Sequence, residues 1–455
     1  MAAGYRFIPP SFALPTRRPG LRDVWRSVRN PVLGWPPEIY EGGCYRSPLP
    51  GAPLIIGNPK LAAEVLVGRS DEFDHGPLLK RIFAPIWGRG IFTAEGPEWR
   101  WQRRAAAPAF RPARMAALAP VIRTAAEVML RRLREGQAVD LQEETRRLTL
   151  QVLFDAALSG GEDFPDRDEA SRRIDGFIGS VGRIVRSDVF PLPERWRPSV
   201  ERRGGAAAAY VRERVGAMVK RRRGEAPRGD LVDLLMAASD PETGRRMDDE
   251  LLRDNLMGFI AAGHETTAYA LAWALWVVAS HASTRERMLQ EIAAVTGGGP
   301  IGEEHVDRLR FTVQVVREVT RIFPTVGVAR ASPRSTQVGG WRVPRGAPVL
   351  IAIYALHRLP DRWEDSYSFD PDRFSGGTPS AGDGIFYLPF GAGPRVCMGA
   401  AFAMTELVVA LATLVRGAEL VPVSPQPELG VRLGTVMSKS GLWAVPSRLA
   451  TPAAC

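Results

Sequence analysis

Apolar residues recur every three or four positions along most of the chain, which is the spacing of amphipathic helices. This spacing predicts helices over 97–110, 115–158, 168–224, 248–280 and 396–416, with two more that end near Ile322. Three prolines within 190–198 divide the third stretch into two helices, because proline breaks a helix interior. The chain is therefore expected to be largely helical.

Shorter stretches have the pattern of strands and turns. Residues 53–67 predict a short strand followed by a helix, and 326–353 predict strands with a hairpin turn at 339–346. The stretch 431–445 predicts a second hairpin, whereas 361–390 is rich in Pro, Gly, Asp and Ser and predicts a loop. The expected fold class is mainly α with small β-sheets (α+β).

The expected domain organisation is simple. Residues 1–50 contain many Pro and Gly residues, so we expect an irregular N-terminal segment followed by a single domain over 51–455. Hydrophobic residues make up 45% of the chain and charged residues 24%, an ordinary globular balance. This balance argues against the disordered, fibrous and disulfide-scaffold classes.

The cysteines and the N-terminal sequence bear on location. Cys44, Cys397 and Cys455 lie far apart, so no disulfide framework or paired-cysteine metal site is expected. A reducing compartment suits such a chain, and we expect a cytoplasmic protein. The first forty residues lack a long apolar run, so neither a signal peptide nor a membrane anchor is expected.

The formal net charge of +10 has two open interpretations. It can reflect a genomic preference for arginine, or it can favour an acidic partner. No zinc-finger or RNA-binding signature accompanies the charge, so nucleic acid is not an expected partner.

The strongest chemical signal surrounds Cys397. A glycine-rich loop runs directly into an apolar helix over 389–403, and Cys397 stands where the two meet. Free N–H groups at a helix N-terminus lower the pKa of a thiol and favour the thiolate, which is the form that binds metals. A lone cysteine after a turn is more often an inert buried thiol, so the residues around it decide between the two.

Five residues near Cys397 favour a cofactor site. Gly391, Gly393 and Gly399 leave space for a flat group close to the backbone. Arg395 can reach an anionic group beside the sulfur, and Phe390 can cover one face of it.

This loop resembles the haem-binding loop of the cytochrome P450 family, whose pattern is Phe-x-x-Gly-x-Arg-x-Cys-x-Gly. Here the pattern is filled by Phe390, Gly393, Arg395, Cys397 and Gly399. The resemblance implies haem b (iron protoporphyrin IX) with Cys397 as the axial ligand to iron. It also implies the P450 fold, in which a long central helix lies over the haem, and a soluble bacterial-type member.

A polar block interrupts the long apolar helix expected over 248–280, which would be about 50 Å long. The block 262–267 reads Ala-Gly-His-Glu-Thr-Thr and resembles the oxygen-activation motif of the family. By that resemblance Glu265 is the acid and Thr266 the alcohol of a proton-delivery pair, whereas His264 has no assigned role. A solvated stripe at a helix kink is the alternative interpretation.

Another pair resembles the Glu-x-x-Arg motif of the family. Glu318 and Arg321 lie on one helical face, and the motif's partner is an arginine in the loop before the cysteine, here Arg373. The resemblance implies a structural role, in which the trio joins the helix to the loop. Taken alone, such a pair is usually a surface ion pair of little energetic value.

The remaining candidates are ligands for the two haem propionates. Trp99 and Arg103 resemble the Trp-x-x-x-Arg helix of the family, and Arg330 resembles a second propionate ligand. Arg395 is the third arginine candidate, because arginine suits paired carboxylate contacts. His357 is a weaker candidate.

The resemblance implies a haem-thiolate monooxygenase that activates O2 and hydroxylates a lipophilic small molecule. With no room for a fused reductase in 455 residues, we expect electrons from a ferredoxin or flavodoxin with its reductase, and a monomeric enzyme. The substrate pocket is expected from segments 75–92, the region near Phe190, 259–267, 324–329 and 435–437.

Two other classes stay open. One is a peroxide-using or isomerising haem-thiolate enzyme, which has no need of the Glu265–Thr266 pair. The other is a non-enzymatic haem sensor that uses Cys397 as an anchor. Dependence of product on a reductase and molecular oxygen distinguishes the expected monooxygenase from both.

Overall fold

The computed structural model describes residues 7–27, 30–47, 52–158, 160, 162, 164, 166–181, 200–379, 384–423, 426–432 and 434–449. Its α-helices are α1 Leu21–Ser27, α2 Pro37–Tyr40, α3 Pro59–Ala63, α4 Gly76–Trp87, α5 Gly96–Ala106, α6 Pro112–Ala116, α7 Ala119–Arg132, α8 Leu141–Ala157, α9 Arg167–Val181, α11 Val200–Arg223, α12 Leu231–Ala237, α13 Asp249–Gly263, α14 Glu265–Ser280, α15 Ala282–Thr296, α16 Arg310–Ile322, α17 Ile353–Leu356 and α18 Ala400–Gly417. Short 3-10 or π turns are η1 Pro31–Gly34, η2 Glu64–Gly68, η3 Ser70–Glu72, η4 Ala107–Phe110, η7 Glu303–Arg308 and η8 Pro371–Phe374.

The strands are β1 Cys44–Arg46, β2 Leu54–Ile56, β3 Val139–Asp140, β4 Val328–Ala331, β5 Thr336–Val338, β6 Trp341–Val343, β7 Pro348–Ile351, β8 Ala418–Pro422, β9 Leu429–Arg432, β10 Thr435–Ser438 and β11 Trp443–Leu449. Four strands form one sheet in the order β1-β2-β7-β4, and three form another in the order β3-β11-β8. The pairs β9–β10 and β5–β6 are hairpins. The prediction of a mainly helical fold with small sheets is confirmed.

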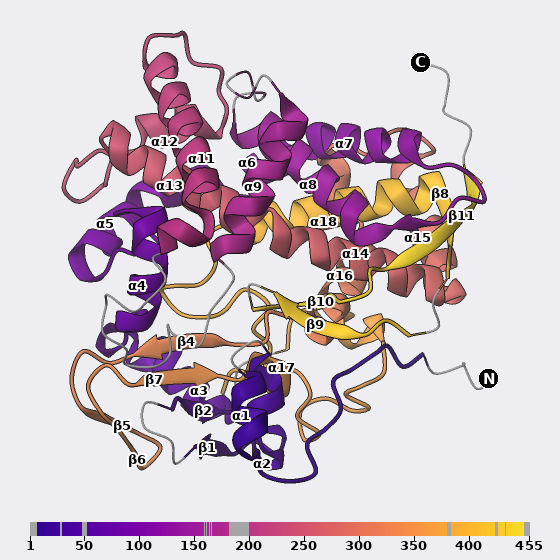
Figure 1. Ribbon diagram of the computed structural model, residues 1–455. Coiled ribbons are helices and arrows are strands. Elements are labelled where there is room, and N and C mark those ends of the chain that lie inside the picture. The colour runs from indigo at the N-terminus through magenta and orange to yellow at the C-terminus, as the bar shows by residue number, and fades with distance from the viewer. Residues whose placement is uncertain are drawn as a thin grey trace.

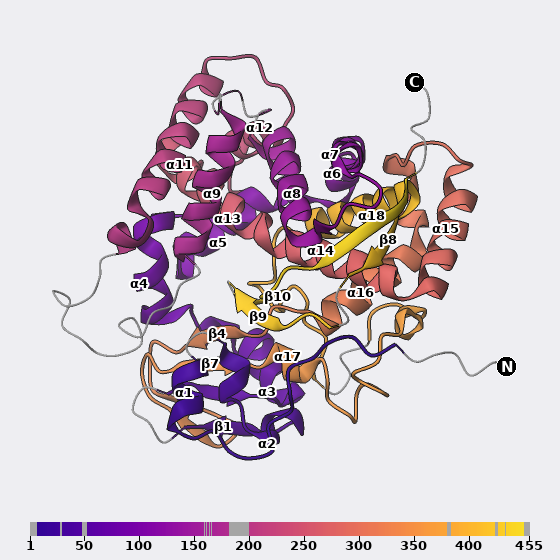
Figure 2. The same ribbon diagram turned by 45° about the vertical axis from the view of Figure 1, so that its right-hand side comes forward.

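Two regions of the molecule are visible in Figures 1 and 2. The helical region is built around α14 and α18, which pack against each other and against α8 and α7. The region drawn below it contains the four-stranded sheet with α1, α2 and α3. The hairpin β9–β10 lies between the two regions. This arrangement leaves the start of α18 close to both α5 and the four-stranded sheet.

The four-stranded sheet joins distant parts of the chain. All three residues of β2 are buried, as expected for a strand with neighbours on both sides. Leu54 to Ile56 pair in parallel with Val349 to Ile351 of β7, and β1 adds the antiparallel edge. The sheet therefore joins a segment near the N-terminus, 44–56, to a segment of the second half of the chain, 328–351.

The N-terminal fifty residues are more regular than their composition suggested. The structure places α1, η1, α2 and β1 within 21–46, and Phe12 and Trp35 are buried in the main core. Prolines favour the first turn of a helix, and Pro31 and Pro37 begin η1 and α2. The segment is therefore integrated with the fold through these buried side chains and through β1.

The long helix predicted over 248–280 is interrupted, so the prediction of one continuous helix is wrong. Helix α13 ends at Gly263 and α14 begins at Glu265, with the break at His264. Thr266 Oγ1 donates a 2.7 Å hydrogen bond to the carbonyl of Ala262, and such bonds compete with the helical backbone pattern. The polar block therefore marks an interruption of the helix within an otherwise apolar stretch.

Helix α18 is apolar for a structural reason. Among the described residues it is the one helix with the length and composition of a membrane span, and 61% of that stretch is buried inside the protein. It packs against α7, α14 and α16, which accounts for its apolar surface. The predicted break at 190–198 and the predicted pocket wall near Phe190 lie outside the described residues.

Candidate haem-thiolate site

Cys397 lies in the turn that precedes α18. Its N–H donates a 2.9 Å hydrogen bond to the carbonyl of Phe390, which closes the loop between the two residues. Gly399 is the N-cap of α18, so the sulfur lies within one turn of the helix start. Although protein surrounds the residue, the Cys397 side chain is exposed to open space on one side. A ligand can therefore approach the sulfur from that side.

The expectation of a lowered thiol pKa is wrong for the protein alone. Burial raises the pKa of Cys397, and this effect outweighs the opposing effects of the Gly399 N–H and the Arg103 charge. A metal ion deprotonates a coordinating thiol outright, so the thiolate form would depend on the bond to the metal. The N–H and the arginine stabilise the negative sulfur once it has formed.

The three glycines of the loop have different functions. Gly391 has a φ of +75°, and a Cβ added there would meet nothing within 4 Å. Gly393 has a φ of +72°, and its added Cβ would lie 1.8 Å from the carbonyl oxygen of Leu66. At Gly399 an added Cβ would be 4.0 Å from the Cys397 sulfur. Gly393 therefore permits close contact with η2, Gly399 leaves space beside the sulfur, and Gly391 borders open space.

Replacing Gly393 with Ala should lower the free energy of unfolding by about 1–3 kcal/mol more than Gly340→Ala does. Both glycines have positive φ, +72° and +81°, but nothing lies within 4 Å of a Cβ added at Gly340. The difference between the two variants therefore isolates the clash with Leu66. Urea unfolding curves measure it, and equal losses would contradict the assigned cause.

Arg103, near Cys397, and Arg330, near Arg395, form no ion pair with a carboxylate among the residues that the structure describes. Arg103 of α5 is half-buried, and burial lowers its pKa while the nearby Cys397 thiolate raises it. Arg330 of β4 is buried, and burial together with the charge of Arg395 lowers its pKa to about 10. Its guanidinium makes one described hydrogen bond, to the carbonyl of Ala329. Each arginine is therefore at least partly removed from water without a carboxylate in contact, and an unpaired charge costs free energy when it is buried.

Arg395, in contrast, already has a carboxylate partner. Its guanidinium forms an ion pair with Glu95 and lies 4.4 Å from the ring centroid of Trp99. His75 Nδ1 is 3.4 Å from a Glu95 oxygen and 3.4 Å from the Arg395 guanidinium. The Trp99 ring therefore has its cation–π contact with Arg395, in the loop before Cys397, and not with Arg103.

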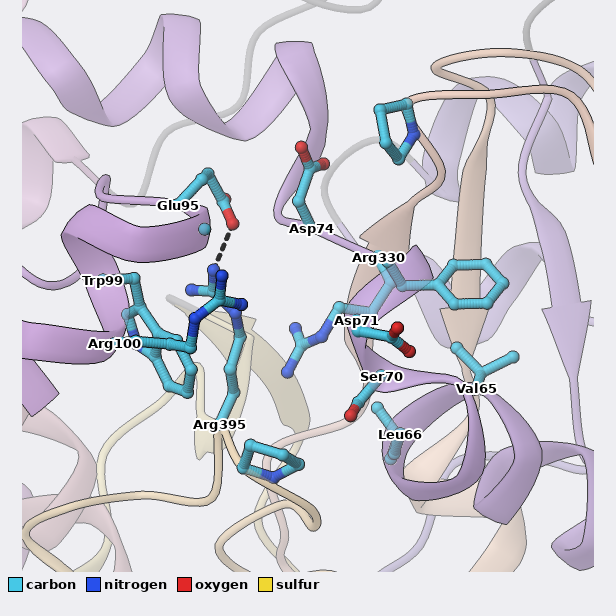
Figure 3. Close-up of a pocket in the computed structure, with 14 residues that line it drawn as sticks. Val65, Leu66, Ser70, Asp71, Asp74, Glu95, Trp99, Arg100, Arg330 and Arg395 are labelled. Atoms are coloured by element: carbon cyan, nitrogen blue, oxygen red, sulfur yellow. Dashed lines mark hydrogen bonds and ion pairs between the residues drawn. The ribbon is translucent and has the colours of Figure 1, made fainter.

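Arg330 and Arg395 line a common pocket of about 400 Å³ (Figure 3). Figure 3 shows the Arg330 side chain reaching toward the middle of the pocket, while Arg395 turns toward Glu95. The other lining residues come from η2, from η3 and the two residues near its end, Phe73 and Asp74, from α5 with the preceding Glu95, and from Pro333 and Pro394. The structure thus brings Arg330, Arg395 and Trp99 together, with Arg103 nearer to the sulfur.

These residues fit haem. An accessible thiol can bind iron, and two arginines without carboxylate partners, the half-buried Arg103 and the buried Arg330, match the two propionates. The described residues contain no cluster of three or more His, Cys, Asp or Glu side chains that could hold a metal by themselves. A group that brings its own ring of metal ligands is therefore the better match to this donor set.

The acid and the alcohol of the polar block lie at the break between α13 and α14. Glu265 is 1% exposed, and neither carboxylate oxygen has a hydrogen-bond partner in the described structure. Burial raises the pKa of Glu265, and the charges of Arg432 and Arg146 oppose the increase. At Gly263 an added Cβ would meet nothing within 4 Å, so the chain is open to a ligand there.

His264 had no role assigned from the family resemblance, but the structure shows its contacts. Its Nδ1 lies 2.9 Å from the Thr149 hydroxyl of α8, and its Nε2 lies 3.2 Å from Asp175 of α9. Asp175 is also 2.6 Å from Arg146 of α8. His264 therefore connects the break in the long helix to two neighbouring helices. No spacing pattern in the sequence signals these contacts, since they depend on the tertiary packing.

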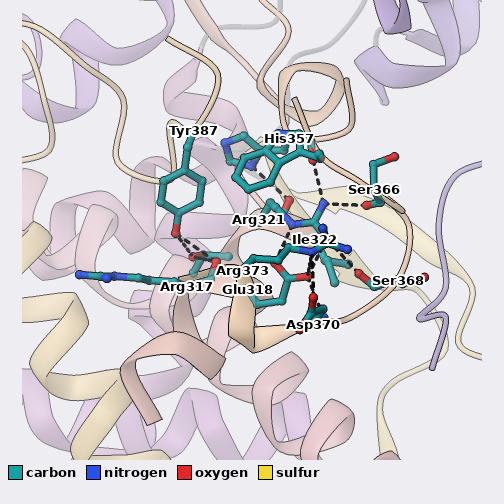
Figure 4. Close-up of polar contacts among 12 residues, drawn as sticks. Arg317, Glu318, Arg321, Ile322, His357, Ser366, Ser368, Asp370, Arg373 and Tyr387 are labelled. Atoms are coloured by element: carbon teal, nitrogen blue, oxygen red, sulfur yellow. Dashed lines mark hydrogen bonds and ion pairs between the residues drawn. The ribbon is translucent and has the colours of Figure 1, made fainter. Parts of the chain in front are cut away.

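The Glu318–Arg321 pair is buried and joins α16 to the loop before the cysteine (Figure 4). Two parallel bonds of 2.6 and 2.7 Å connect the side chains, and Arg373 Nε lies 3.3 Å from Glu318. The other three N–H groups of Arg321 donate to the carbonyls of His357, Ser366 and Ser368. All five donors of Arg321 are thus used.

His357 belongs to this network, and its ring nitrogens contact Arg321 and Leu388, neither of which is a propionate candidate. Its Nδ1 lies 3.1 Å from the carbonyl of Arg321, and its Nε2 accepts the N–H of Leu388 at 2.8 Å. Complete burial lowers the pKa of His357 to about 3, so the ring is neutral. With both ring nitrogens occupied, His357 is unsuited to bind a propionate, which corrects that weaker expectation.

A helical fold that presents the accessible Cys397 thiol beside two arginines without carboxylate partners fits the class of haem-thiolate proteins. A family model for cytochrome P450 matches residues 47–439. The chain therefore belongs to the cytochrome P450 family. It is accordingly a cytochrome P450 monooxygenase with haem b as its cofactor.

Relatives agree with this assignment. Cyclooctatin synthase of Streptomyces melanosporofaciens is 31% identical over 391 residues, which cover 83% of each chain. Cyclooctat-9-en-7-ol 5-monooxygenase of the same organism is 30% identical over 378 residues, 82% of this chain and 81% of that protein. The crystal structure of the cytochrome P450DA haem domain has a TM-score of 0.76 at 26% identity, over 91% of each chain.

Proposed function

We propose that this chain hydroxylates a lipophilic small molecule with molecular oxygen, using electrons from a separate redox protein. The observation that carries the proposal is the accessible Cys397 thiol, with the Gly399 N–H and Arg103 beside it. That arrangement stabilises a negative sulfur and leaves one side of it open to iron. In this proposal the Cys397 thiolate would bind the haem iron.

The surrounding residues divide the remaining tasks. When bound, a thiolate-held haem would supply the chemistry of oxygen activation. Arg103 and Arg330 would hold its two propionates, and Arg395 with Trp99 would form one wall beside them. Phe390, Gly391 and Gly399 shape the space around the sulfur.

Glu265 and Thr266 deliver protons to the oxygen site in this proposal. Burial raises the pKa of Glu265, so the carboxyl can hold a proton nearer neutral pH and release it. Thr266 lies one residue further along the chain, and its hydroxyl bonds to the Ala262 carbonyl across the helix break. A buried acid next to an alcohol suits proton relay.

An apolar substrate is supported by the aromatic side chains between α4 and α13. Phe83 and Trp87 stack at a centroid distance of 4.4 Å, and Trp87 lies 5.0 Å from Phe92. Phe92 is in turn 6.2 Å from Phe259 of α13. Two relatives are named for cyclooctatin chemistry, which agrees with a lipophilic substrate such as a terpenoid.

The proposed electron donor is a ferredoxin or flavodoxin with its reductase, and the proposed setting is a monomer in the cytoplasm. The net charge of +10 suits an acidic carrier. Turnover with a ferredoxin should therefore fall about tenfold from low salt to an ionic strength near 0.15 M, where charges are screened. Turnover that is indifferent to added salt would remove the electrostatic part of this proposal.

The decisive experiment is the carbon monoxide difference spectrum of the reduced protein, for wild type and for Cys397→Ala. Wild type should give the Soret band of a thiolate-ligated haem, and the variant should lose it. Cys44→Ala is the matched control, since Cys44 lies in β1, outside the cysteine loop. A wild-type protein that binds no haem would overturn the proposal.

Turnover conditions separate the proposal from its rivals. Product that requires a reductase and molecular oxygen supports the monooxygenase, whereas product formed with peroxide alone favours a peroxide-using enzyme. Binding of haem with no turnover under either condition would favour a sensor. Candidate substrates can be screened by the spin-state shift that their binding causes.

A further inference from the structure

The buried carboxylate of Glu265 has one close cation in the described structure. Nη2 of Arg432 lies 2.9 Å from a Glu265 oxygen, although the geometry is that of an ion pair and no hydrogen bond forms. The Glu265 side chain is 1% exposed, whereas that of Arg432 is 36% exposed. Arg432 therefore extends from the protein surface to a carboxylate that has no solvent contact of its own.

Arg432 comes from β9, which is far from Glu265 in the sequence. The hairpin β9–β10 is fixed by Val436, whose carbonyl accepts the indole N–H of Trp273 on α14 at 3.1 Å. Val326 N–H donates to the carbonyl of Gly434 in the same hairpin. The hairpin is thus attached to the helix that carries Glu265, which sets the position of Arg432 relative to the carboxylate.

Helix α9 leaves space for the arginine. A Cβ added at Gly179 would lie 3.1 Å from Arg432 Nη2, so a larger residue would press on the guanidinium. Glycine has the lowest helix propensity after proline, and this close contact gives a reason for its presence within α9. The guanidinium is therefore confined between α9 and the Glu265 carboxylate.

The other charged groups near Glu265 have other partners. Arg146 of α8 is 2.6 Å from Asp175 of α9, and Asp175 also contacts His264. Tyr269 of α14 is buried, and burial raises its pKa to about 12, so it is neutral. The charges of Arg146, Asp175 and His264 influence the pKa of Glu265 without touching it. Arg432 is the cation in contact with the carboxylate.

We propose that Arg432 is a positioning residue that holds the Glu265 carboxylate at the helix break and connects it to solvent through the hairpin β9–β10. The inference rests on the proposed function, because it deepens the assigned role of Glu265 as the proton-delivery acid. The hairpin would then determine the orientation of the Glu265 carboxyl group and the route by which that group takes up protons from solvent.

Infrared spectroscopy of the haem-loaded protein tests the contact without turnover. The band of the protonated Glu265 carboxyl is assigned by its absence in Glu265→Gln and is then followed with pH. Arg432→Gln should raise the midpoint of that band by about 1–3 pH units, because an adjacent opposite charge lowers a carboxyl pKa by that amount. Arg432→Lys keeps the charge and should give a smaller increase.

Lys439→Gln is the matched control. Lys439 follows β10 directly, is exposed and pairs with Glu428, so its loss removes the same charge without touching Glu265. An Arg432→Gln midpoint no different from that of Lys439→Gln would overturn the inference. This readout is independent of the carbon monoxide spectrum, so failure of the inference and failure of the proposed function are distinguishable.

A second measurement concerns coupling, which is the fraction of consumed electrons that ends in product. Arg432→Gln should lower the product formed per NADH consumed and raise peroxide release, and Arg432→Lys should restore part of the yield. Gly179→Val, which crowds the guanidinium, should shift the yield in the same direction as Arg432→Gln. Unchanged coupling in Arg432→Gln would overturn the proposed connection to proton supply.

Discussion

Replacing Glu318 with Gln is expected to lower the free energy of unfolding by about 3–5 kcal/mol, the cost of removing one partner of a buried ion pair. The substitution leaves Arg321 wholly buried with carbonyl partners and no carboxylate among the described residues. Arg373 loses its nearest carboxylate as well. Urea unfolding of the haem-loaded protein measures the loss.

The matched control for this variant is Glu169→Gln on α9. Glu169 makes two contacts, with Arg172 and Arg173, but all three side chains are substantially exposed. Exposed pairs contribute about 0–1 kcal/mol, so this variant should be nearly as stable as wild type. Similar losses in the two variants would show that the buried network is not the source of the stability.

Replacing Glu265 with Gln is expected to lower the rate of product formation by about 100-fold or more, the range for loss of an acid–base group. Glutamine keeps the shape of the side chain but cannot release a proton at neutral pH. The Soret band with carbon monoxide should persist, because Glu265 lies on α14 and Cys397 lies in the loop before α18. Product, NADH consumption and peroxide are measured together.

Glu250→Gln provides the control on α13, the helix that precedes the break. Glu250 lies in the first turn of α13 and is exposed, far along the helix from the break. Its substitution should leave the product rate within about twofold of wild type. A Glu265→Gln enzyme with wild-type coupling would show that protons reach oxygen by another route.

The sequence was informative where local spacing determines the structure. The Cys397 loop, the Glu318–Arg321 pair and the helix that carries Arg103 could each be recognised because their members lie within a few residues. The short strands with glycine turns were recognisable for the same reason. Interactions within one or two helical turns leave a pattern in a single sequence.

Contacts across the fold left no such pattern. Nothing near Glu265 in the sequence indicates Arg432, and nothing near His264 indicates Asp175, because tertiary packing alone brings these pairs together. The interruption at His264 was expected only as the alternative interpretation, a helix kink, because periodicity reports which side chains are apolar and does not show where a helix is interrupted. The pairing of Arg395 with Glu95 was also missed, because tertiary packing alone brings these two residues together.

The parallel pairing of β2 with β7 has a consequence for synthesis of the protein. Leu54 to Ile56 leave the ribosome about 300 residues before their partners Val349 to Ile351. At about 5–20 residues per second, this apolar strand waits roughly 15–60 s for its neighbour. During that interval the nascent chain presents an unpaired hydrophobic strand, which is the kind of segment that chaperones bind. We therefore expect the yield of folded protein to depend on chaperone supply and on translation speed.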